Sequence, residues 1–160
     1  MRVFVVLILC FNFMFGADSD GFRDIKWGDA PTKEMVISKY DATTNIKKYY
    51  LQNEKLSVGE ASITGISYWF FDDKFMGAFM QFSGLSNFES LKSTLDAKFG
   101  NAHRPNKYLD DYMWMGGNTR VAIYYSKIKR SGMVMFVNDE LAKQSDQYKK
   151  SIAAKAVNDI

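Results

Sequence analysis

The fold is decided by residues 68–82, which read YWFFDDKFMGAFMQF. The Asp-Asp-Lys segment at 72–74 separates two runs rich in aromatic residues and methionine, and this pattern predicts a β-hairpin. In the second run, 75–82, both alternating faces are largely apolar, which is typical of a central strand that is covered on both sides. Residues 68–71 are four consecutive aromatics, so two of these rings must point to each side of the sheet.

Further strands are predicted on both sides of this hairpin. Short runs rich in Tyr, Ile, Val, Met and Trp alternate with turn-forming Gly, Asn, Ser and Asp,. These runs are 46–51, 61–71, 112–115, 120–126 and 133–137. A shorter strand is expected around Ile25 and Trp27, which share a face, and Gly28 ends it because glycine permits turns that other residues resist. We therefore assign Trp27 and Gly28 a structural role.

The clearest predicted helix follows the hairpin, over 86–99. Ser86 and Glu89 have the spacing of a capping box,. Four apolar residues then recur at helical spacing up to Gly100, which is a C-terminal stop. They are Phe88, Leu91, Leu95 and Phe99. We expect this apolar stripe to pack on the sheet.

Two weaker helical segments are also expected. Pro31 stands where a helix begins, so 32–37 is predicted to form one or two helical turns. Asp139 is a candidate cap for a final helix that runs toward Val157. The apolar stripe of this final helix is thin, so the helix either frays on the surface or offers its stripe to a partner.

Together these elements predict one α+β domain, a single antiparallel sheet of about six strands with helices packed on it. A helical segment followed by antiparallel strands occurs over 32–82 and again over 86–137, so an internal two-fold repeat is a further expectation. The expected organisation is a signal peptide over 1–17, the α+β domain over 18–138 and a C-terminal helix or tail over 139–160.

The N-terminus indicates export. Arg2 precedes an apolar run over 3–15 that ends in small residues and then acids, which is the pattern of a secretory signal peptide. The run is shorter than the roughly 20 residues that a membrane span needs. The only cysteine, Cys10, lies inside it, and Leu9 occupies the position where a lipoprotein signal carries a small residue. The chain has no Asn-x-Ser/Thr glycosylation site,, so a periplasmic location is expected.

Three segments carry a resemblance to known proteins. They are FRDIKWG at 22–28, FSGLSNFESLK at 82–92 and KFG at 98–100. Together they resemble an uncharacterised family of small exported bacterial proteins. The order of helix, loop and Trp114-bearing strand is similar to that of β-lactamase-inhibitor-like folds and of small outer-membrane assembly lipoproteins. The resemblance implies binding to other proteins, although the lipidated cysteine of those lipoproteins is missing here.

Catalytic motifs are sparse. His103 is the only histidine, so a nucleophilic triad or a His/Cys zinc site has too few members,. The acidic pairs at 72–73 and 110–111 fit turn chemistry better than metal binding or a two-carboxylate hydrolase. The formal charge is only +3 and falls by one when Arg2 leaves with the signal, which does not favour a nucleic-acid partner,. A non-enzymatic protein without cofactor or metal is expected.

The surplus of large aromatic residues favours a binding role. The candidate interface residues are Tyr68, Trp69, Phe71 and Trp114, with another exported or envelope protein as the expected partner. Core packing is the alternative explanation of these rings. An alternative function is that of a carrier for a small apolar ligand, with adaptable methionines lining the pocket. These methionines are Met76, Met80, Met113, Met115, Met133 and Met135.

Overall fold

The structure is a computed structural model that describes residues 19–157, so the predicted signal peptide lies outside the described residues. In chain order the elements are β1 (Gly21–Phe22), β2 (Ile25–Lys26), β3 (Met35–Asp41), β4 (Ile46–Leu51), β5 (Ser57–Val58), β6 (Ala61–Ser62), β7 (Gly65–Phe71), β8 (Lys74–Ser83), α1 (Leu85–Phe99), β9 (Asp110–Gly116), β10 (Thr119–Ser126), β11 (Ser131–Asn138) and α2 (Asp139–Val157). The main sheet is antiparallel, with the strand order β3-β4-β7-β8-β11-β10-β9. The α+β class is confirmed. The main sheet has seven strands rather than about six, and the prediction of a single sheet is wrong, because β1–β2 and β5–β6 form two further small sheets.

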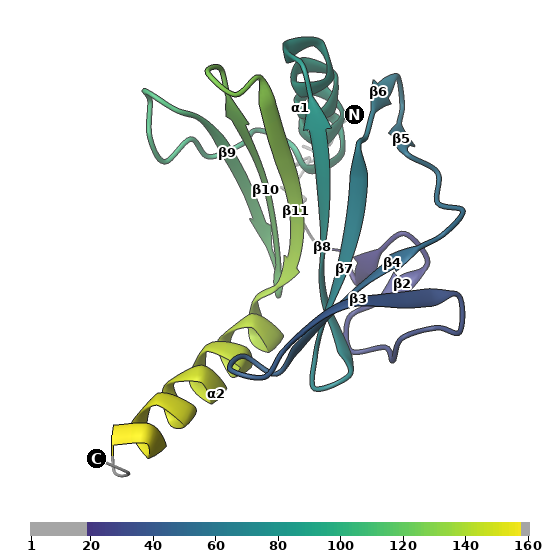
Figure 1. The fold of residues 1–160 in the computed structure, drawn as a ribbon. Helices are drawn as coiled ribbons and strands as arrows, with labels where there is room; N and C mark the ends of the chain where they lie inside the picture. Colours follow the sequence, from purple (N-terminus) through teal and green to yellow (C-terminus); the bar gives the residue numbers. More distant parts are fainter. Residues whose placement is uncertain (1–18, 158–160) are drawn as a thin grey trace, which may run out of the picture.

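The hairpin at the centre of the sequence forms as predicted. Phe71 pairs with Lys74, and the two turn residues Asp72 and Asp73 have φ of 49° and 58°. Positive φ at both central residues gives the tight turn whose twist matches that of the strands, and Asp tolerates this conformation better than most residues. β8 lies at the middle of the sheet between β7 and β11 (Figure 1).

The sheet consists of two meanders that meet at its centre. β3, β4, β7 and β8 form one meander, and β9, β10 and β11 form the other, with β8 pairing to β11 where they meet. Only the second meander is preceded by a helix. The helix predicted over 32–37 is wrong, because this stretch leads into strand β3. Val36 and Ile37 are β-branched and pair with Tyr50 and Tyr49 of β4, which outweighs the helix-start signal of the preceding proline.

Helix α1 begins one residue earlier than predicted and ends before Gly100, as expected. The predicted stripe is confirmed, since Phe88, Leu91, Leu95 and Phe99 are its buried residues. The capping box does not form, because the N-cap is Gly84 with φ 89° and no side chain caps the helix. Gly84 connects strand to helix so directly that Ser86 already lies inside the first turn.

The N-terminal segment closes the core beside α1. The strand predicted around Ile25 is a small hairpin of β1 and β2. Trp27 stacks on Phe75 with ring centroids 5.1 Å apart, and its Nε1–H donates to the Ser19 carbonyl at 2.8 Å and to Thr119 Oγ1 at 2.9 Å. Gly28 has φ +87°, and its N–H donates to the Phe75 carbonyl at 3.0 Å. Both residues thus hold the N-terminal segment against the sheet.

Helix α2 packs on the sheet only with its first half. Asn138 accepts the N–H of Leu141 at 2.9 Å, so the cap is Asn138 rather than Asp139,. Leu141 and Ala142 contact the apolar group formed by Ile46 and Phe71. The rest of the helix runs away from the sheet (Figure 1).

Candidate functional site

The two faces of the main sheet are covered very differently. One face packs against α1 and the β1–β2 hairpin, and this side contains the main core. Among the described elements, α2 is the helix that packs on the opposite face, and it reaches only one end of it. Arg120 and Ala122 of β10 also lie on this second face, where the strand pairing places nine further side chains in adjacent rows. We call this set the open face, and it consists of Ser67, Trp69, Phe79, Gln81, Met113, Met115, Tyr124, Met133 and Met135.

Three of the four predicted interface aromatics do not lie on an exposed surface, so that part of the prediction is wrong. Tyr68, Phe71 and Trp114 are 0%, 8% and 3% exposed. Tyr68 and Trp114 lie in the main core on the covered face. The Tyr68 ring contacts Phe22 of the N-terminal hairpin, and Trp114 Nε1–H donates to the Gly100 carbonyl after α1 at 2.8 Å. Phe71 lies beneath α2, with its ring 6.2 Å from that of Tyr148. Core packing therefore explains these three rings, and Trp69 alone remains as a candidate contact.

Trp69 is the centre of a polar and aromatic cluster on the open face. Its ring lies 4.1 Å from that of Phe79 on the neighbouring strand, and its Nε1–H donates to Ser67 Oγ at 3.0 Å. Lys48 Nζ lies 3.6 Å from the centroid of the Trp69 ring, a cation–π distance,. Burial lowers the pKa of Lys48 below its ordinary value, and the positive charge of Lys39 adds to this effect.

The six methionines of the predicted pocket lining divide between the two faces. Met80 lies in the main core and Met76 lies beneath α2. The other four occupy the open face, on strands β9 and β11. They are Met113, Met115, Met133 and Met135. Because methionine is flexible and polarisable, this row of side chains can adapt its shape to a contacting surface.

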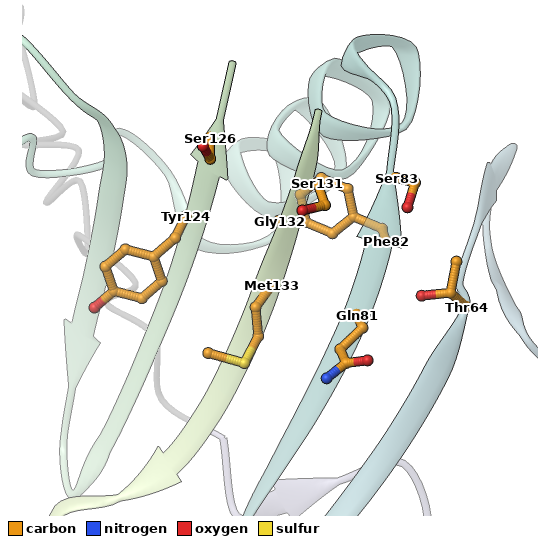
Figure 2. A pocket seen from close by; sticks show the side chains of 9 residues that line it. All are labelled: Thr64, Gln81, Phe82, Ser83, Tyr124, Ser126, Ser131, Gly132 and Met133. Atoms are coloured by element: carbon orange, nitrogen blue, oxygen red, sulfur yellow. The ribbon is translucent and has the colours of Figure 1, made fainter. Parts of the chain in front are cut away.

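A hollow of about 430 Å³ lies at the end of the open face that is remote from α2. Figure 2 shows Tyr124, Met133 and Gln81 side by side on three strands, with Ser126, Ser131 and Ser83 beyond them. Apolar side chains and hydrogen-bonding groups are thus combined in one shallow hollow. This combination suits the side chains and backbone of another protein.

A second concave region, the α1 cleft, lies on the covered face. It has a volume of about 750 Å³ between α1 and the N-terminal hairpin. Beside it, the buried Glu54 carboxylate is held by Arg23 and by the hydroxyl of Tyr68. Burial, and then the Glu54 carboxylate, raise the pKa of Tyr68 well above its ordinary value. This group ties the loop before β5 to the core.

His103 and the Asp72–Asp73 pair lie in a loop and in a turn. His103 is exposed and its backbone forms an isolated bridge with Met113. The Asp72–Asp73 pair lies in a turn, where Asp73 pairs with Lys47 at 2.8 Å. Within the described part of the chain, no group of three or more metal-binding side chains comes together. Over the same residues no helix is both long and apolar enough to cross a bilayer.

No family model, curated protein or solved structure matches the chain. The resemblance to small exported bacterial proteins therefore stays a prediction from the sequence. The proposals on function therefore rest on the open face and the α1 cleft. The sequence analysis did not name Phe79 and Tyr124 among the candidate contact residues. The signal that could have identified them is their alternation with buried neighbours along β8 and β10.

Proposed function

We propose that this chain is an exported, non-catalytic binding protein of the bacterial envelope that contacts another exported protein through the open face. The observation that carries the proposal is that one face of a seven-strand sheet presents Trp69, Phe79, Tyr124 and four methionines while α2 covers only its end. Apolar residues grouped on an exposed surface are characteristic of interaction sites. Met115, at 63% exposure, and Tyr124, at 37%, are its most exposed large apolar side chains.

The shape and polarity of the open face favour a protein as the occupant. The hollow is shallow, and Gln81, Ser126 and Ser131 give it hydrogen-bonding groups beside Met133 and Tyr124. Interfaces between proteins combine an apolar centre with a polar rim in this way, and aromatic residues and methionine are enriched at their centres. Trp69 is the expected anchor, because tryptophan is among the residues that most often dominate binding energies.

The test begins with a photo-reactive amino acid at position 133, in the hollow, and in a matched variant at Leu85. Leu85 is 47% exposed on α1, on the opposite side of the sheet. A partner that contacts the open face is captured at position 133 and not at position 85. The captured protein is then identified and purified, so that its affinity for the unlabelled chain can be measured directly.

Substitutions then assign the contact to the open face. Trp69→Ala is expected to weaken binding of the purified partner by at least about 2 kcal/mol. Met115→Glu is also expected to weaken binding, because it places a charged carboxylate in the buried part of the interface. Leu85→Glu is the control for an added charge elsewhere and leaves the affinity unchanged. Equal capture at positions 133 and 85, or an unchanged affinity in Trp69→Ala, would remove the open face from the proposal. A cross-link between two copies would identify a homodimer instead.

The α1 cleft supports a second candidate function, a carrier for a small apolar ligand. Its volume falls within the roughly 300–1,000 Å³ that is usual for small-molecule sites,. It lies on the covered face of the sheet, away from the open face. The two candidate functions therefore depend on different residues and are tested separately.

A further inference from the structure

Two neighbouring segments at one end of the sheet expose large apolar side chains. They are the loop before β9 and the turn that joins β10 to β11, and both lie at the end of these strands that is remote from α2 (Figure 1). Ile128 in the turn is 97% exposed, and Tyr108 and Leu109 in the loop are 82% and 50% exposed. The three side chains line one shallow hollow between the two segments.

The same two segments carry a surplus of positive charge. Residues 104–111 and 127–130 contain five basic and two acidic side chains, so their net charge is +3. The formal charge of the whole chain is also +3, and the rest of the chain is therefore neutral in sum. We call these two segments the basic tip.

The acidic residues of the basic tip do not remove this surplus. Asp110 forms ion pairs with both Arg104, at 3.4 Å, and Lys127, at 3.1 Å. Asp111 is the cross-strand neighbour of Tyr124 on the open face, and its single charge offsets only one of the remaining cations. Three exposed cations are left, and within residues 19–157 no ion pair includes them. They are Lys107, Lys129 and Arg130.

We infer that the basic tip binds the surface of a bilayer that contains anionic phospholipid. Ile128 and Leu109 enter the boundary between head groups and acyl chains, where their apolar surface leaves water. Tyr108 remains at the level of the head groups, where tyrosine is enriched in membrane proteins. Arg130 and the lysines attract the lipid phosphates, and their long side chains reach the head groups while the apolar residues are buried. The inference goes beyond the proposed function, because it concerns the end of the sheet and not the open face.

The exposure of the apolar residues favours a lipid surface over an acidic protein. A protein interface is packed about as densely as a protein interior, so its anchoring side chains need partner atoms of fixed shape around them. Ile128 stands between Lys127 and Lys129 with almost no neighbours on its own chain. A bilayer takes up such a side chain without a preformed pocket, and the flanking cations complement its phosphates.

The first experiment measures binding of the purified protein to lipid vesicles by sedimentation. The protein is purified after export and its N-terminus is sequenced, so that the apolar signal peptide does not contribute. Vesicles of phosphatidylcholine alone are compared with vesicles in which a third of the lipid is phosphatidylglycerol. Binding is expected to the anionic vesicles only, and to weaken as salt is added. Binding to neither kind of vesicle, or equal binding to both, would overturn the inference and leave the open-face proposal untouched.

A pair of variants tests the apolar contact. Ile128→Ser is expected to weaken binding to the anionic vesicles about tenfold or more, because a side chain of this size no longer leaves water. Ile37→Ser is the matched control, since it makes the same change at a side chain of β3 that is 51% exposed, and it leaves binding unchanged. Equal loss in the two variants would remove the tip from the inference. Circular dichroism and thermal melting check that each variant is folded.

A second pair of variants tests the charges. Lys129→Gln combined with Arg130→Gln is expected to weaken binding to the anionic vesicles about thirtyfold. Lys149→Gln combined with Lys150→Gln makes the same change in net charge on α2, at the other end of the sheet, and has a smaller effect. Equal losses would assign binding to overall charge and contradict the inference. A photo-reactive amino acid at position 128 that captures an acidic protein, without any vesicle binding, would assign the tip to a protein instead.

Discussion

Replacing Leu95 by alanine tests the central packing contact of the fold. Leu95 is 6% exposed and belongs to the main core, where it joins α1 to the sheet. Large-to-small substitutions at such positions cost about 2–5 kcal/mol, and the cost rises with the volume of the empty space left behind. Leu95 also lines the α1 cleft, so water can enter part of the space that the substitution creates. We therefore expect a loss of about 2–3 kcal/mol in the free energy of unfolding.

The measurement is denaturant unfolding followed by tryptophan fluorescence, with thermal melting as a second readout. For a domain of this size, 2–3 kcal/mol corresponds to a decrease in Tm of about 8–12 °C. Leu85→Ala is the matched control, because it makes the same chemical change on the same helix at a side chain that is 47% exposed. Its expected cost is within about 0.5 kcal/mol. Equal costs for the two variants would refute the packing of α1 described above.

Two further predictions concern the N-terminal segment and Tyr68. Trp27→Phe keeps the ring contact with Phe75 but removes the Nε1–H donor, so we expect it to lower the free energy of unfolding by about 1 kcal/mol. Trp27→Ala also removes the ring and is expected to lower it by about 3 kcal/mol. Both values are measured by chemical denaturation, and equal losses in the two variants would contradict this order. The pKa of Tyr68 is raised on folding, so above pH 10 the unfolded chain releases the phenolic proton while the folded chain keeps it. The wild-type protein should therefore lose more stability per pH unit than Tyr68→Phe, by about 0.7 kcal/mol at pH 10 and nearly 1.4 kcal/mol at pH 11.5. Parallel stability curves for the two proteins over this range would contradict the prediction.

Elements with a local sequence pattern were predictable. The β7–β8 hairpin follows from the Asp-Asp turn between two apolar runs, and α1 follows from four apolar residues at helical spacing. β3 was not predictable from local pattern, because most of its residues are exposed and its stability comes from pairing with β4. The helix cap at Gly84 was also missed, since the connection from β8 determines where α1 begins.

The candidate site could be predicted only in part. The alternation of residues 68–71 correctly separates Tyr68 and Phe70 from Trp69 and Phe71. Because both sides of this strand are apolar, the pattern does not tell which side faces a helix. That choice depends on where α1 and α2 pack, which involves residues distant in sequence. Three of the four proposed contact residues were consequently assigned to the wrong environment.

The seam between β8 and β11 has a consequence for the order of folding. Each meander contains only strands close in sequence, but the seam joins Gly77 to Val137 and Ser83 to Ser131. Closing such a long loop costs more chain entropy than forming either meander, so the seam is the kinetically demanding contact. Until it closes, the unpaired edges of β8 and β11 are available to the same edges of another chain, which is the geometry of strand exchange between folding molecules.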